Sequence, residues 1–269
     1  MAKQDFEPLL SSTIMRVVSL VPSLTQTLFD LGLSSTEVVG RTPWCIHPAP
    51  QVNDVMIVGG TKTPNLGKIR ALKPDLIVMD REENPLKVYQ TLFDEGFEIF
   101  VSSVESPSDV PDMLRALGAA CDRNFAGEQL ALLCEDSIQG VNRNNPALRT
   151  IPLIWQDPLM AVSPTRYAGA ILSEVGFEVI DTHPNGNGYP EVTVDDFIKH
   201  KIELILLTSE PHKFTLAEGN EIVEQISSAG GIPPRVEFID GEDLTWFGTR
   251  TAPAIARLVE FRKKIQDSN

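Results

Sequence analysis

The sequence predicts an α/β fold with two lobes, each built on a parallel sheet, and a long interlobe helix that joins them. Short β-rich runs alternate with helical segments, as in βαβ units. The alternation stops between residues 106 and 145, where two helical stretches follow one another, and then resumes. With 269 residues, 42% of them hydrophobic, the chain can bury two cores. We expect an N-terminal α/β lobe at 14–121, the interlobe helix at 122–145 and a C-terminal α/β lobe at 146–269.

The N-terminal half supplies the first set of alternating elements. Its expected strands are short apolar runs, and glycine or proline punctuates the helices between them. In chain order we expect a strand at 16–20, a helix from Ser23 to Gly32, a strand at 38–40, and, after a proline-rich irregular segment, a helix at 65–72, a strand at 76–79, a helix at 86–95 and a strand at 97–101.

The second half begins with helices. Ser106 and Pro107 form a good N-cap and first helical residue, and a long helix is expected from about Arg123 to Asn142. The βα pattern then continues with a strand at 152–155, a helix at 165–175, a strand at 177–180, a helix capped by Thr193 and a strand at 204–207.

Composition excludes several classes of function. The net charge of −14 opposes binding to phosphate backbones, so nucleic acid is not an expected partner. The apolar runs are far shorter than the roughly 20 residues of a membrane span, so we do not expect the chain to span a membrane. Residues 1–10 lack the basic and apolar regions of a signal peptide, so the chain as written is expected to be cytoplasmic.

Three segments together resemble the class III periplasmic-binding-protein family, the helical-backbone metal receptors of cobalamin and iron-chelate ABC transporters. Residues 16–32 read RVVSLVPSLTQTLFDLG, residues 58–78 read VGGTKTPNLGKIRALKPDLIV, and residues 244–253 read LTWFGTRTAP. The resemblance implies two lobes joined by a stiff helix, a ligand cleft between them, delivery to an ABC permease and, for a processed family member, a periplasmic location.

The chain also departs from this family at four positions. Cobalamin-binding members carry aromatic residues where this chain has Thr61 and Asp80, although Trp246 persists. The acidic residues that dock such receptors onto a permease are replaced by Gly67 and Gly248. A subgroup with Cys-x-His-Pro, Glu-Glu-Asn, Ser-Glu-Pro and Trp-(Phe/Tyr)-Gly-x-Arg motifs resembles the chain more closely.

Candidate ligand-binding residues follow the predicted strands. Ligands of open parallel α/β sheets bind beyond the carboxyl ends of the strands, and unusual polar and aromatic side chains collect there. The candidates are Trp44, Cys45, His47, Glu82, Glu83, Asn84, Trp155, Glu210, Asp240, Trp246 and Arg250.

Several candidates have two interpretations. Cys45 and His47 are spaced to ligate a metal such as zinc, copper or iron, but the thiol could instead pack as a small apolar group. Glu83 and Glu210 precede prolines and could contact a ligand or cap backbone N–H groups.

Two cationic candidates have the same ambiguity. Arg250 could bind a ligand carboxylate or form a salt bridge with Asp240 or Glu242. His212 is a ligand candidate whose alternative is a plain surface role.

The three tryptophans indicate the shape of the ligand. Each lies beside one of these loops, which suggests a flat, partly apolar ligand such as a macrocycle, although Trp155 could instead be a core residue. The sequence has no Gly-x-Ser-x-Gly, P-loop or His-Glu-x-x-His motif. We therefore expect a binding protein for a metal chelate or macrocycle of the cobalamin, haem or siderophore class. The sequence leaves the cofactor open, with a bound metal ion or metal chelate as the candidate. The alternative is a cytoplasmic metal- or tetrapyrrole-handling enzyme or chaperone on the same fold.

Overall fold

The computed structural model describes residues 14–143 and 146–267. Residues 1–10, on which the expectation of a cytoplasmic location was based, lie outside the described residues. The same holds for residues 144–145 of the expected interlobe helix and residues 268–269 of the expected C-terminal lobe. The described chain forms two compact units, one with residues 14–25 and 33–101, the other with residues 26–32 together with the chain from 102 onward. The ranges 14–121, 122–145 and 146–269 stay predictions.

The first unit contains a five-stranded sheet in the order β3-β2-β1-β4-β5. The pairs β1–β2, β1–β4 and β2–β3 are parallel. Its elements are β1 (Val17–Ser19), the start of α1 (Pro22–Asp30), β2 (Val38–Arg41), the 3-10 helix η1 (Gln51–Asp54), β3 (Met56–Ile57), α2 (Leu66–Leu72), β4 (Leu76–Asp80), α3 (Leu86–Asp94) and β5 (Ile99–Ser102).

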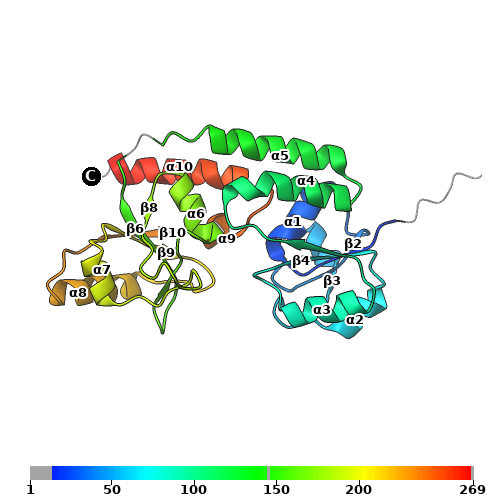
Figure 1. Ribbon diagram of the computed structural model, residues 1–269, viewed down its shortest axis with the longest axis horizontal. Coiled ribbons are helices and arrows are strands. Elements are labelled where there is room, and N and C mark those ends of the chain that lie inside the picture. The colour runs from blue at the N-terminus through cyan, green and yellow to red at the C-terminus, as the bar shows by residue number, and fades with distance from the viewer. Residues whose placement is uncertain (1–13, 144–145, 268–269) are drawn as a thin grey trace, which may run out of the picture. The chain divides into compact units, whose positions relative to one another are not determined.

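The core of the first unit lies between its sheet and the helices α2 and α3, which share one face of the sheet (Figure 1). β4 is buried along its whole length, as its continuous apolar run predicts for a central parallel strand. Ile69 of α2 and Leu92 of α3 are fully buried against it. Because two helices anchor this face, the loops that follow the strands have a rigid support.

The second unit contains the other sheet, in the order β10-β9-β6-β7, with β8 also paired to β6. β8, β9 and β10 belong to its parallel ladders, and the short β7 runs antiparallel to β6. Its elements are η2 (Pro107–Asp109), α4 (Val110–Ala120), α5 (Asn124–Gln139), β6 (Arg149–Trp155), β7 (Met160–Ala161), α6 (Tyr167–Glu174), β8 (Glu178–Val179), α7 (Val194–Lys199), β9 (Leu204–Thr208), α8 (Leu216–Ser228), β10 (Arg235–Ile239), α9 (Gly241–Thr245) and α10 (Thr251–Asp267).

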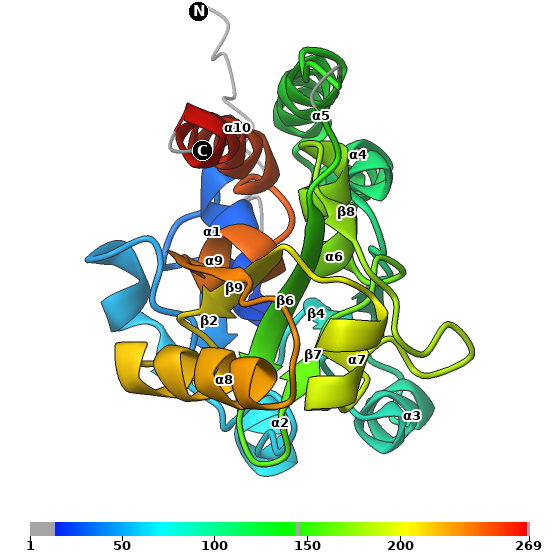
Figure 2. The ribbon, with the colours of Figure 1, turned by 90° about the vertical axis from the view of Figure 1, so that its left-hand side faces the viewer.

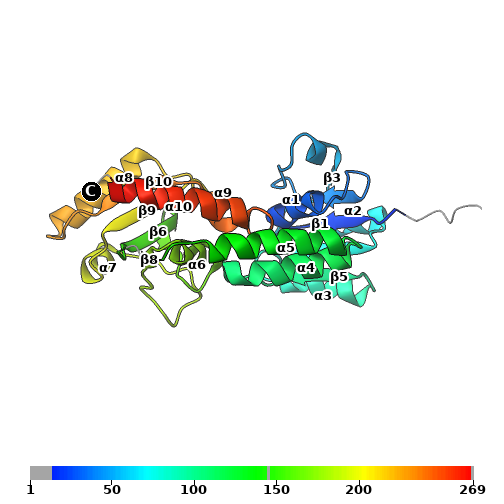
Figure 3. The same cartoon turned by 90° about the horizontal axis from the view of Figure 1, so that it is seen from above.

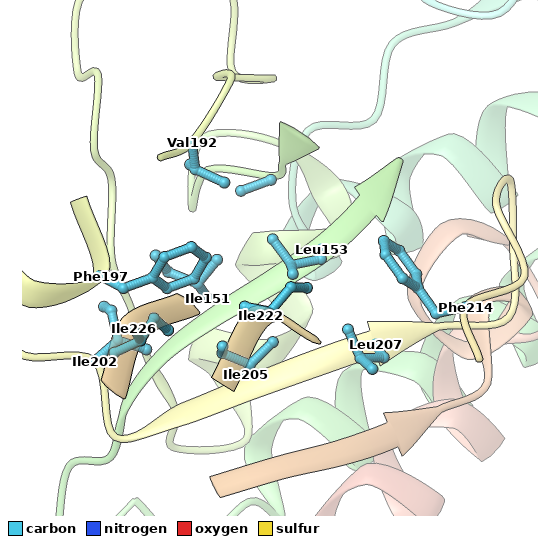
Figure 4. Close-up of a cluster of buried hydrophobic side chains, with 11 residues drawn as sticks. Ile151, Leu153, Val192, Phe197, Ile202, Ile205, Leu207, Phe214, Ile222 and Ile226 are labelled. Carbon is cyan, nitrogen blue, oxygen red and sulfur yellow. The ribbon is translucent and has the colours of Figure 1, made fainter. Parts of the chain in front are cut away.

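Helices α7 and α8 cover one face of this second sheet, while α6 lies on the other (Figure 2). The core on the α7 and α8 side combines Leu153 of β6 and Leu207 of β9 with Phe197 and Ile222 from the helices. Figure 4 shows Phe214 at the end of this cluster, beside Leu207. Phe214 therefore ties the loop after β9 to the core.

Helices α4 and α5 lie side by side (Figure 3). A Cβ atom added at Gly118 of α4 would lie only 2.9 Å from the Cα atom of Gly127 in α5. The two glycines therefore permit a backbone approach that larger residues would prevent. The expected helix at 123–142 is present as α5, one residue later at its start and three residues shorter at its end.

The expected α/β architecture with two sheets is confirmed. The N-cap assigned to Ser106 is also present, since Ser106 and Asp109 form a capping box with Pro107 in the first turn. None of the helices in the described ranges combines the length and apolar composition that a bilayer span requires.

Candidate functional site

Each sheet has a topological switch point, a central strand with strands from different parts of the chain on its two sides. In the first unit β1 is flanked by β2 and β4, and in the second unit β6 is flanked by β9 on one side and by β7 and β8 on the other. Ligands of open α/β sheets bind beyond the carboxyl ends of the strands at such switch points. The predicted candidate residues follow β2, β4, β6, β9 and β10, so they lie at these edges within their own units.

The turn after β2 carries Trp44, Cys45 and His47. The Trp44 side chain is 65% exposed, whereas Cys45 is fully buried. The Cys45 Sγ lies 3.0 Å from Thr25 Oγ1 and 3.1 Å from Thr42 Oγ1, within hydrogen-bonding distance of both hydroxyls. Burial raises the pKa of the thiol, although these hydrogen bonds partly oppose the shift.

A resident metal would require a thiolate with free coordination sites at Cys45. The thiol is instead buried and hydrogen-bonded, an environment that fits the packing interpretation better than the metal interpretation. Within the described ranges, no three His, Cys, Asp or Glu side chains are grouped so that they could hold a metal ion. The chemistry of this turn therefore rests on the exposed indole of Trp44 and on His47.

The loop after β4 is organised by a buried carboxylate. One Asp80 oxygen accepts the backbone N–H groups of Glu82 and Glu83 at 2.8 and 3.0 Å. The Asn84 amide is also buried; it donates to Leu20 and Thr61 carbonyls at 3.3 and 3.0 Å and accepts the Asp80 N–H. Asn84 is thus committed to holding the loop, while Glu82 and Glu83 stand exposed at its tip.

The start of α3 bears on whether Glu83 caps backbone N–H groups of that helix. Pro85 occupies the N-cap position of α3, so Glu83 lies in the turn before the helix. Its carboxylate remains a candidate for contact with a ligand.

In the second unit, Trp155 and His212 meet at the switch point between β6 and β9. Their ring centroids are 6.1 Å apart in an edge-to-face arrangement, and the Trp155 side chain is 43% exposed. His212 also packs edge-on against Phe214 at 4.7 Å, and its Nε2 lies 2.8 Å from Glu218 Oε1. Trp155 is therefore a half-exposed aromatic face at the end of a central strand, and the core interpretation does not describe it.

Glu218 is a part of this arrangement that the sequence did not single out as a site residue. Its second carboxylate oxygen accepts from the Thr215 N–H and hydroxyl in the capping box of α8, at 2.6 and 2.7 Å. The hydrogen bonds from Thr215, and then that to His212, lower the pKa of Glu218. A Thr-x-x-Glu capping box before α8 was the available signal.

Glu210 and Trp246 form a second pair in the same unit. The Glu210 Oε1 accepts the indole N–H of Trp246 at 3.0 Å and the Thr245 hydroxyl at 2.8 Å. Burial raises the pKa of Glu210, and the neighbouring carboxylates of Glu242 and Asp240 add to the increase. The Trp246 side chain is only 7% exposed, so it buttresses Glu210 more than it offers a face to solvent.

Arg250 is held by carboxylates around α9. Its guanidinium lies 2.8 Å from Glu242, 3.4 Å from Asp243 and 3.9 Å from Asp240. It also stacks over Trp246, 5.7 Å from the ring centroid. Arg250 therefore forms the salt bridges that brace the loop, which is the second of its two interpretations.

Asp240 has a structural duty as well, since its side chain caps α9 by accepting the Glu242 N–H at 3.0 Å. It also belongs to a pocket that opens at the ends of β9 and β10. The pocket has a volume of about 430 Å³ and is lined by Thr208, Ser209, Lys213, Phe214, Phe238, Ile239 and Asp240. Of these seven residues the sequence predicted Asp240 alone as a site residue. A lysine after a strand and a phenylalanine inside one, such as Lys213 and Phe238, are too common to signal a site.

The comparisons with known proteins agree with this architecture. A family model described as periplasmic binding protein matches residues 17–229, most of the chain. This chain belongs to the periplasmic binding protein family. The assignment confirms the family resemblance; the match includes residues 17–32 and 58–78, whereas the segment at residues 244–253 lies beyond it.

Relatives and solved structures show the same pattern. A vitamin B12-binding protein of Pectobacterium carotovorum is 26% identical over 203 residues, 74% of this chain and 72% of that protein. The periplasmic vitamin B12 binding protein BtuF of Vibrio cholerae matches 93% of this chain and 97% of its own, with a TM-score of 0.76 and 20% identity. The apo haem-binding protein RhuT from Roseiflexus sp. RS-1 matches 92% and 97%, with a TM-score of 0.75 and 16% identity. These solved structures share the fold of this family member.

The four positions at which the resemblance predicts a departure from related receptors have distinct environments. Thr61 and Asp80, where aromatic residues are expected in cobalamin-binding members, are buried in the first unit. Gly67 is exposed in the first turn of α2, whereas Gly248 is buried with φ +101°. A Cβ atom at Gly248 would lie 2.3 Å from Thr27 Oγ1, so this site has no room for a docking carboxylate.

Proposed function

We propose that this periplasmic binding protein is the substrate-binding component for a metal chelate or macrocycle of the cobalamin, haem or siderophore class. The observation that carries the proposal is the half-exposed indole of Trp155, held against His212 at the switch point of the second sheet. A rigid aromatic face at this place suits a flat, partly apolar ligand. Relatives named as vitamin B12-binding and haem-binding proteins support this ligand class.

The proposed contacts differ in chemistry. In the second unit Trp155 stacks on the ligand, His212 and Glu210 offer polar contacts, and Trp246 holds Glu210 in place. The first unit, taken by itself, has an exposed indole at Trp44 and an exposed carboxylate at Glu83. Because the polar side chains of the second unit are hydrogen-bonded in the free protein, little ordering should be needed when ligand arrives.

Fluorescence titration with cyanocobalamin and with haemin tests the proposal. Binding should quench the indole emission, and Trp155→Ala should weaken the affinity by about 2 kcal/mol, roughly 30-fold, which is the scale of an aromatic anchor. Phe125→Ala is the matched control because Phe125 is an exposed aromatic residue, 79% accessible, on α5, a helix that carries none of the candidate residues. Unchanged affinity in the Trp155 variant would contradict the proposed contact.

Metal analysis by native mass spectrometry extends this test to ligands that are not in the titration. Protein purified without chelator should carry a stoichiometric metal chelate or macrocycle if its ligand is available to the producing cell. Catalytic turnover of the bound compound would instead favour a tetrapyrrole-handling enzyme. Absence of binding to every chelate and macrocycle tested would count against the whole ligand class.

Delivery to an ABC permease is the second part of the proposal, with a weakened docking contact. Exposed charges mainly steer an encounter and set its register, and Gly67 and Gly248 supply none. A pull-down with a cobalamin-type permease should therefore show weak capture, and Gly67→Glu should increase it because this position is exposed in the first turn of α2. Tight capture of the unmodified chain would refute this part.

A further inference from the structure

We infer that the pocket at the ends of β9 and β10 is a binding site for a small planar organic anion, an aromatic or conjugated ring that carries a carboxylate. The pocket lies entirely within the second unit, so it needs no residue of the first. This inference does not rest on the proposed function. Its volume of about 430 Å³ falls within the range of small-molecule sites.

The apolar wall of the pocket accounts for the planar body. Phe238 lies on β10, an outer strand of the sheet, and its ring is 44% exposed. Phe214, by contrast, is 4% exposed and is anchored in the core beside Leu207 (Figure 4). A fixed ring and an accessible ring lining the same pocket provide a surface on which another flat ring can pack.

The charges of the pocket select the sign of the ligand. Lys213 is exposed, and in residues 14–143 and 146–267 its ammonium group makes no ion pair or hydrogen bond. The chain carries 37 acidic residues against 23 Lys and Arg, so an ammonium group without an ion-pair partner is unexpected. Asp240, the anion of the pocket, is already engaged by the Glu242 N–H and lies 3.9 Å from Arg250. Lys213 is therefore the cation of the pocket that keeps its hydrogen-bond donors for a ligand.

Ser209 provides a further polar contact. Its Oγ accepts the N–H of Gly241 at 2.9 Å, so its hydroxyl proton is available to a ligand. A carboxylate can accept this proton and an ammonium N–H of Lys213 together. Ser209 and Lys213 thus supply the hydrogen bonds, and the phenylalanines supply the packing surface.

Three probes of the same shape and different charge test the inference: benzoate, neutral benzamide and cationic benzamidine. The readout is the ¹H–¹⁵N shift of pocket residues such as Ser209 and Phe238 during titration of the full chain. For nine non-hydrogen atoms we expect benzoate to bind with a Kd on the order of 1 mM. Benzamide should bind about fivefold more weakly, and benzamidine more weakly still.

Lys213→Met identifies the cation. This exposed substitution should weaken benzoate binding about fivefold and leave benzamide binding unchanged. Lys87→Met is the matched control, since Lys87 is an exposed lysine on α3 of the other unit. Phe238→Ala should weaken both ligands.

Three results would overturn the inference. They are tighter binding of benzamidine than of benzoate, equal effects of the two lysine variants, and shifts confined to residues outside the pocket. Failure of cyanocobalamin and haemin to bind would leave this result untouched, so the two proposals fail separately.

Discussion

The carboxylate of Asp243 in α9 contacts two arginines, and its removal should destabilise the second unit. Asp243 is 6% exposed and accepts both Arg257 Nε and Nη2, at 2.6 and 2.5 Å, while Arg250 approaches to 3.4 Å. Asp243→Asn keeps the shape of the side chain but removes its charge. Both guanidinium groups then lose their shared counterion.

The burial of the three groups sets the size of the effect. Breaking a fully buried ion pair costs about 3–5 kcal/mol because a charge is left uncompensated. The Arg257 side chain is 50% exposed and the Arg250 side chain is 18% exposed, so water and Glu242 compensate part of the loss. We expect a decrease of about 2–3 kcal/mol in the free energy of unfolding.

Urea unfolding followed by tryptophan fluorescence measures this change. With an m-value of about 2–3 kcal/mol per M, the transition midpoint should fall by about 1 M at unchanged m. Glu95→Gln is the matched control, because Glu95 forms the same two-bond contact with Arg70, at 2.6 and 2.7 Å, on the surface of the first unit. Equal midpoint shifts in the two variants would refute the argument that burial decides the strength of the pair.

Three further outcomes are expected. Gly248→Ala should lower the free energy of unfolding by about 1–3 kcal/mol more than Gly176→Ala. Both glycines have positive φ, but only at position 248 would the added Cβ atom meet Thr27 Oγ1, 2.3 Å away. Similar urea midpoints for the two variants would contradict this. Burial raises the pKa of Glu210 in the folded chain, so the unfolded state binds fewer protons. The free energy of unfolding should therefore fall as the pH rises above the ordinary glutamate range. Denaturation curves from pH 4 to 8 should show a smaller dependence on pH for Glu210→Gln. Burial raises the pKa of Cys45 and brings that of Cys134 to about 12. Both thiols should therefore resist a thiol reagent at pH 8 in the native protein and react once urea unfolds the chain. Rapid labelling of the native protein would count against their burial.

Periodic patterns in the sequence determined the elements of the fold. The continuous apolar runs in β4 and β9 predict central parallel strands, and both strands are buried throughout. Ser106 and Pro107 predict the first turn of a helix because their effect is local to the backbone. Such signals act over a few residues and need no knowledge of the rest of the chain.

The strand-end positions of the candidate site were also predictable, since parallel strands bring their carboxyl ends to one edge. The sequence left open what each side chain does there. Cys45 could ligate or pack, and two threonine hydroxyls and complete burial favour packing. Arg250 could bind a ligand or brace a loop, and the carboxylates of α9 brace it.

Only the tertiary structure decided which indoles are exposed and which polar groups are already paired with other groups of the protein. Trp155 and Trp246 are equivalent in the sequence as aromatic residues beside predicted loops, yet one is 43% exposed and the other 7%. Exposure depends on contacts with residues distant in the chain, such as the 36-residue separation between Glu210 and Trp246. The sequence by itself determined the elements and the edge where the candidate residues lie, whereas the structure decided their partners, because partners are chosen by packing across the fold.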